Sequence, residues 1–142
     1  MDKPDKEQVI ALLRRFTHAD DNPEEIMGVY CGLLDLGQPV ILTLAEILAD
    51  ESLGLEVESV VLLENLGNLL NIRPALPSLW KIANKCPKDR AKLVAASLIW
   101  SLDNRRAAKL FGIMDSLRQS DDPQVRQLAD EKLRAMATWG GT

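Results

Sequence analysis

Prolines and the residues before them divide this sequence into segments of helical length. Asn22-Pro23, Gln38-Pro39 and Asp122-Pro123 each place a polar residue before a proline, which is typical of the first turn of an α-helix. Pro74 and Pro87 fit the same position. The sequence therefore predicts eight helices with short connections, at about residues 5–18, 23–36, 39–50, 56–71, 74–85, 87–102, 104–119 and 123–138.

The composition also favours helices. The chain contains 24 leucines and 14 alanines, whereas aromatic residues make up only 4%, and leucine and alanine are strong helix formers. No run of alternating apolar and polar residues between turn residues predicts a strand. We therefore expect an all-α protein, and 142 residues suit a single domain over residues 1–142.

Turns and apolar positions recur along the chain. The turn at Asp21-Asn22-Pro23 returns as Asp121-Asp122-Pro123, and Leu33 returns as Leu133. This offset equals three repeats of about 33 residues, the length of a helix pair. Because one helix pair cannot bury its own apolar face, such pairs stack and cover one another.

The second half of the chain resembles the HEAT repeat family. Ala75-Leu76-Pro77-Ser78-Leu79 resembles the opening of a HEAT repeat, and Asp122-Pro123-Gln124-Val125-Arg126 resembles the start of its second helix. The resemblance is closest over residues 74–136, and before them Ile26 occupies the family's arginine position. It implies an α-solenoid of about four antiparallel helix pairs, with the second helices lining an inner surface. The alternative is an irregular helical bundle.

Charge is divided unequally along the sequence. Residues 1–71 contain 14 acidic and 4 basic side chains, a net charge of −10, and residues 72–142 contain 7 acidic and 13 basic ones, a net of +6. No lysine or arginine lies between Arg15 and Arg73. This division either keeps the surface solvated or attracts a basic partner. Complementary ends could also join copies of the chain head to tail as a homo-oligomer.

Nucleic acid is a weaker candidate for the partner. The net charge of −4 argues against it, because proteins that bind nucleic acid need a basic stripe. The second half alone could contact phosphate, through Lys88, Arg90, Lys92, Arg105, Arg106 and Lys109.

Two predicted helices in the acidic half offer a candidate surface. In helix 23–36, Glu25, Gly28, Gly32 and Asp35 share one helical face. Glycine inside a helix costs about 1 kcal/mol relative to alanine, so these two glycines indicate either close packing against a neighbouring helix or room for a partner.

Helix 56–71 carries a polar stripe beside its apolar residues. If second helices line the inner surface, the acidic and amide side chains of both helices form a concave binding face. The predicted partner-binding residues are Glu25, Asp35, Glu58, Glu64, Asn65 and Asn68.

The sequence gives little support for catalysis, metal binding or a cofactor. His18 is the only histidine, and together with Asp20 and Asp21 at a helix end it provides too few ligands for a typical site. We therefore predict no catalytic residue, no metal and no cofactor. Cys86 has lysines on both sides, as reactive thiols often do, although a structural thiol is the simpler interpretation. Cys31 and the tryptophans Trp80 and Trp100 are expected in the core.

These features predict a non-catalytic protein–protein interaction module that masks or tethers a basic protein partner through the acidic face. An immunity or inhibitor protein that neutralises a basic toxin or nuclease is one form of this function. An enzyme or enzyme subunit is the alternative class, since HEAT-like lyases and nucleic-acid glycosylases exist. No apolar run approaches the roughly 20 residues of a membrane span, the first residues do not resemble a signal peptide, and two distant cysteines suit a reducing compartment. We therefore expect a cytoplasmic protein.

Overall fold

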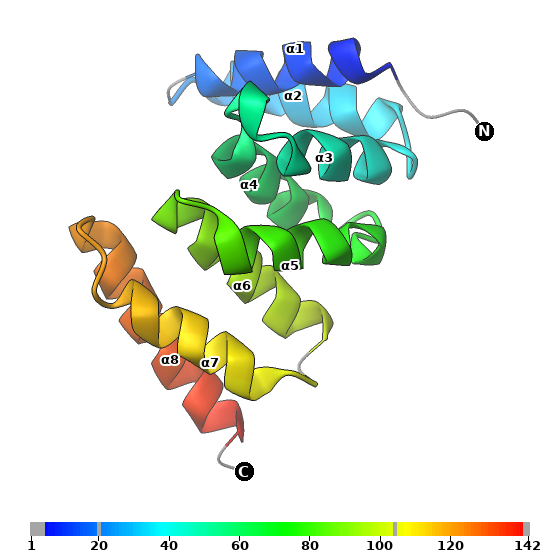
Figure 1. Ribbon diagram of the computed structural model, residues 1–142. Helices are drawn as coiled ribbons and strands as arrows, with labels where there is room; N and C mark the ends of the chain where they lie inside the picture. Colours follow the sequence, from blue (N-terminus) through cyan, green and yellow to red (C-terminus); the bar gives the residue numbers. More distant parts are fainter. Residues whose placement is uncertain (1–4, 20, 104, 141–142) are drawn as a thin grey trace. The chain divides into compact units, whose positions relative to one another are not determined.

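The computed structural model describes residues 5–19, 21–103 and 105–140, the side chains of 138–140 excepted, and the described part contains helices and no strand (Figure 1). Its α-helices are α1 (Lys6–Thr17), α2 (Pro23–Asp35), α3 (Val40–Ala49), α4 (Glu56–Leu66), α5 (Leu76–Lys85), α6 (Asp89–Leu102), α7 (Ala107–Leu117) and α8 (Pro123–Gly140). Two short 3₁₀ helices, η1 (Glu51–Leu53) and η2 (Arg73–Ala75), precede α4 and α5. The prediction of an all-α protein with eight helices in these positions is confirmed.

One predicted boundary is wrong. The helix expected over residues 56–71 ends at Leu66, and Gly67 follows it. The Gly67 and Leu70 amides close the end, donating to the carbonyls of Leu63 and Leu66 at 2.9 and 2.8 Å. Asn68 therefore lies in a turn. Glycine and asparagine are poor helix formers, which explains why α4 stops where its apolar pattern continues. The predicted start of another helix, residue 104, lies outside the described residues.

Side-chain caps fix the starts of α1, α2 and α8, the last through the Asp122 carboxylate, which accepts the Gln124 amide at 2.9 Å. The Asp5 carboxylate accepts the Glu7 amide at 3.1 Å, and the Asn22 side-chain oxygen accepts the Glu24 and Glu25 amides at 3.1 and 3.3 Å. Such caps satisfy backbone N–H groups that have no partner within the helix. The polar residue before Pro23 thus begins α2, as the sequence predicts.

The chain forms two compact units, Met1–Ser78 and Leu79–Thr142, so that the division falls within α5. In the first unit, α1 packs against α2, and α3 packs against α4. Helix α1 also contacts α3 and α4, and α2 contacts α4. The core of this unit includes the fully buried side chains of Leu13, Leu33, Ile41, Leu44, Leu48, Leu62 and Leu63.

In the second unit, α7 packs against both α6 and α8, and α6 also contacts α8. Leu79, Ile99 and Leu110 are fully buried in its core, with the small side chains of Ala95 and Ala129.

No single helix in the described part is long and apolar enough to cross a membrane. Helices α2 and α3 together have the length and composition of a span, but they meet at a bend of 115°.

Candidate functional site

The two glycines of α2 lie against α1. A Cβ atom on Gly32 would stand 3.0 Å from a methyl carbon of Leu12, and one on Gly28 would stand 3.3 Å from a guanidinium nitrogen of Arg15. Close packing of a neighbouring helix, the first of the two interpretations of these glycines, is therefore confirmed.

Glu25 faces the same neighbour. The Arg15 Nε donates to the Glu25 carboxylate at 2.9 Å, and both side chains are about half exposed. The cation offsets the charge of this carboxylate on the α1 side of the helix, so the structure places Glu25 in a contact between helices.

The open face of α2 consists of the exposed residues Glu24, Met27, Cys31 and Asp35. Their spacing of three or four residues places them along one side of the helix. The prediction that Cys31 lies in the core is wrong, because the glycine face packs against α1 and the side that carries Met27 and Cys31 faces solvent. Met27 is 61% exposed.

Tyr30 connects this face to α4. The Asn65 amide nitrogen lies 2.6 Å from the Tyr30 hydroxyl, and the Phe16 ring packs edge-on against the Tyr30 ring at 6.3 Å between centroids. Burial raises the pKa of the Tyr30 phenol, the hydrogen bond to Asn65 lowers it, and the nearby Glu64 carboxylate raises it, with a net shift upward. Glu64 therefore lies close enough to Tyr30 to act on it electrostatically.

Glu58 and Asn68 have different surroundings. Glu58 is half-buried, and its carboxylate accepts the Thr17 hydroxyl of α1 at 2.9 Å. Asn68, in the turn after α4, donates from its amide nitrogen to the Asn65 carbonyl at 3.4 Å.

The structure therefore divides the six predicted residues. Glu64, Asn65 and Asn68 lie on α4 and the turn after it, and Asp35 lies on the open face of α2, whereas Glu25 and Glu58 pair with side chains of α1. We define the α2–α4 face as Glu24, Met27, Tyr30, Cys31, Asp35, Glu64, Asn65 and Asn68. Glu24, Met27, Tyr30 and Cys31 were not among the predicted residues, because the residues predicted on α2, Glu25 and Asp35, share the side of the helix that carries the glycines.

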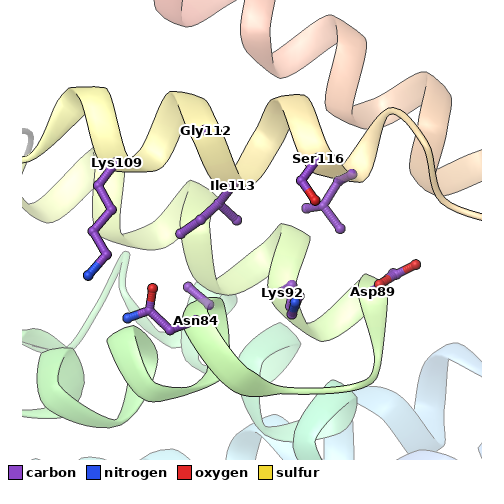
Figure 2. Close-up of a pocket in the computed structure, with 9 residues that line it drawn as sticks. Asn84, Asp89, Lys92, Lys109, Gly112, Ile113 and Ser116 are labelled. Atoms are coloured by element: carbon purple, nitrogen blue, oxygen red, sulfur yellow. The ribbon is translucent and has the colours of Figure 1, made fainter.

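The second unit contains a groove of about 460 Å³ beside α7, shown in Figure 2. Its lining residues are Ala83, Asn84, Asp89, Lys92, Lys109, Gly112, Ile113, Ser116 and Leu117. The lining thus combines two lysines, one carboxylate and two neutral polar side chains with three apolar ones and a glycine.

The tryptophans expected in the core are only half-buried. The Arg106 guanidinium carbon and the Lys109 nitrogen lie 5.7 and 5.4 Å from the centroid of the Trp80 ring. Trp100 packs edge-on against Phe111 at 6.0 Å. The core prediction is therefore wrong for both tryptophans, and the basic side chains of Arg106 and Lys109 lie over the Trp80 ring.

Cys86 is buried, and the Lys88 amide donates to its sulfur at 3.4 Å. Its flanking lysines are exposed, so burial of the thiol favours the structural interpretation of this cysteine. Among the described residues, no group of three or more His, Cys, Asp and Glu side chains could hold a metal ion. Asp20, one carboxylate considered beside His18, lies outside the described residues.

Comparison with known proteins gives no assignment. No family model matches the chain, and no curated protein and no solved structure matches it either. Two features of the molecule are candidate binding sites, the α2–α4 face and the groove beside α7.

Proposed function

We propose that this chain is a non-catalytic protein-binding module that docks a basic protein partner on the α2–α4 face. The observation that carries the proposal is an exposed apolar side chain, Met27, on a face whose own charged residues are carboxylates, while the Arg15 guanidinium beside Gly28 pairs with Glu25. Glu24, Asp35 and Glu64 supply the carboxylates, and no lysine or arginine lies between Arg15 and Arg73.

The apolar residues of this unit provide binding free energy. Met27 is 61% exposed and Leu69, which follows Asn68, is 71% exposed. Burying a side chain of this size against a partner stabilises a complex by about 1.5–3 kcal/mol. Methionine and tyrosine are also enriched at the centres of protein interfaces.

The carboxylates provide specificity and speed of association. Charges around an apolar centre steer a partner of opposite sign and disfavour partners of the same sign. A basic protein surface therefore fits the α2–α4 face better than an acidic or a neutral one. A basic toxin or nuclease, neutralised by an immunity protein, is one partner of this kind.

We also propose that the helices stack as HEAT-like pairs. The contacts between α1 and α2, α3 and α4, and α7 and α8 support pairing of consecutive helices. The Asn65–Tyr30 contact, which joins the second helices of the first two pairs, supports a shared surface.

The proposal is tested by capture of basic proteins from the source lysate, followed by affinity measurements with the purified partner. We expect the partner to be retained at low salt and released at about 0.5 M salt, where exposed charges are strongly screened. The double variant Asp35→Asn/Glu64→Gln should weaken binding at low salt by tenfold or more, and Met27→Ser should weaken it at both salt concentrations.

The matched control is Glu7→Gln/Glu51→Gln, which changes the net charge equally at exposed carboxylates outside the face. The control should stay within about twofold of the native affinity, because distant exposed charges are screened. Equal losses in both double variants, or unchanged affinity in Met27→Ser, would reject the α2–α4 face as the docking site.

A further inference from the structure

We propose that the groove beside α7 binds a small organic phosphate, attracted by the positive charge of Lys92 and Lys109 in its lining. This site lies in the second unit, and the proposal does not depend on the α2–α4 face. Figure 2 shows α7 along one side of the groove and the residues of α5 and α6 along the other, with Lys109 reaching across toward Asn84.

The two lysines provide unneutralised positive charge. Lys92 comes from α6 and Lys109 from α7, and within the described part of the chain neither ammonium forms an ion pair with a carboxylate. Lys109 instead lies over the Trp80 ring. Lysine is a common phosphate ligand because its compact charge can be approached from many directions.

One carboxylate also lines the groove, but its hydrogen bonding directs it elsewhere. One oxygen of the Asp89 carboxylate accepts the Ser120 hydroxyl at 2.6 Å, and Figure 2 shows Asp89 at the opposite end of the groove from Lys109. The remaining polar groups in the lining, the Asn84 amide and the Ser116 hydroxyl, can both donate to phosphate oxygens.

The rest of the lining suits the organic part of the ligand. Ala83 and Leu117 are buried at the base of the groove, and Ile113 is half-buried beside them. A volume of about 460 Å³ lies within the range of small-molecule sites, which typically combine an apolar wall with a few polar groups.

Gly112 leaves open space in the lining of the groove. It lies inside α7, where glycine costs about 1 kcal/mol relative to alanine, yet a Cβ at this position would have no atom within 4 Å. Helix packing therefore does not require a glycine here, in contrast to Gly28 and Gly32. Its missing side chain widens the groove at the middle of the α7 wall.

The fluorescence of Trp80 can be used to measure phosphate binding at Lys109. Its ring lies 5.4 Å from the Lys109 nitrogen, so a phosphate that binds this ammonium will change the fluorescence of the indole. We would titrate the full chain with phenyl phosphate, inorganic phosphate, benzoate and phenol, by fluorescence and by isothermal titration calorimetry. Trp80→Phe should abolish the change in fluorescence and leave the calorimetric signal.

We expect phenyl phosphate to bind at least tenfold more tightly than inorganic phosphate or phenol, and more tightly than benzoate. Lys92→Gln/Lys109→Gln should weaken phenyl phosphate binding by tenfold or more, and Gly112→Leu should block it while the melting temperature stays close to that of the native chain. Lys132→Gln, at an exposed lysine of α8, is the single-charge control for Lys92→Gln.

Three results would overturn the proposal. The first is the absence of phenyl phosphate binding at millimolar concentration. The second is an equal loss of affinity in Lys132→Gln and Lys92→Gln, which would indicate general attraction of anions. The third is unchanged affinity in Gly112→Leu, which would place the ligand outside the groove.

Discussion

Two hydroxyl groups in the first unit are buried without a hydrogen-bond partner in the described part of the chain. They belong to Thr43 of α3 and Ser59 of α4, whose residues are 1% and 0% exposed. A buried polar group without a partner destabilises the folded state by about 1–3 kcal/mol. These hydroxyls therefore weaken the core of the first unit.

Thr43→Val replaces the hydroxyl with a methyl group of similar size. We expect it to raise the free energy of unfolding by about 1 kcal/mol, as measured by urea denaturation. Thr17→Val is the contrasting variant, because the Thr17 hydroxyl donates to the Glu58 carboxylate at 2.9 Å, with the Leu13 carbonyl as a second acceptor within reach at 3.1 Å, and its loss should lower stability. A decrease in both variants would indicate that the Thr43 hydroxyl has a partner.

The sequence predicted which helices form and where they begin better than it predicted which side of a helix faces solvent. The cap at Asn22 and the proline after it are local signals, and α2 begins where they indicate. Which side of α2 faces solvent depends on α1, since Leu12 and Arg15 cover the two glycines. A single sequence does not specify that pairing, so Glu25 was assigned to the open face and Met27 was not.

The contact between α2 and α4 can be measured through Tyr30, the only tyrosine of the chain. Its pKa should lie above the ordinary value of 10.0 in an ultraviolet titration of the phenolate. Because Glu64 raises this pKa and the Asn65 hydrogen bond lowers it, Glu64→Gln should shift it down and Asn65→Ala should shift it up. Shifts in the same direction would contradict this arrangement.

The same residue predicts a pH dependence of stability. A raised pKa means that the fold favours the neutral phenol. The stabilisation of the folded state by this phenol is therefore complete below the pKa that Tyr30 has in the unfolded chain. The contribution is lost as the pH rises through the folded pKa of Tyr30. Tyr30→Phe should remove this part of the decline in stability at alkaline pH, which urea denaturation at several pH values would detect.

For the molecule as a whole, the aromatic residues separate the two units spectroscopically. All three tryptophans lie in residues 79–142, and the one tyrosine lies in residues 1–78. The division between the units falls inside α5, and a helix forms cooperatively along its length. We therefore expect one unfolding transition for the chain.

This expectation is tested by urea denaturation with two probes. Tryptophan fluorescence reports on residues 79–142, and the ¹⁹F resonance of 3-fluorotyrosine at position 30 reports on the other unit. The two curves should coincide, as they do for a two-state protein. Separate midpoints would show that the chain consists of two domains, against the single domain that the sequence predicts.

The uneven distribution of charge was evident in the sequence. The sequence did not show which carboxylates pair with other side chains and which lie on an open surface. The sequence shows that most acidic residues lie in the first half. The pairing of Glu25 with Arg15 and of Glu58 with Thr17 depends on how the helices pack against one another. The groove beside α7 was missed for the same reason. Its lysines come from different helices, and only Gly112, a glycine inside a predicted helix, gave a local indication.

The different burial of the two cysteines has a consequence for handling the protein. Cys31 is exposed on the α2–α4 face, whereas Cys86 is 4% exposed. Oxidants and alkylating reagents will therefore react first with Cys31 in the folded chain. A preparation stored in air will accumulate disulfide-linked pairs of chains joined through this face, and a maleimide dye will label the native protein at one position, between Met27 and Asp35.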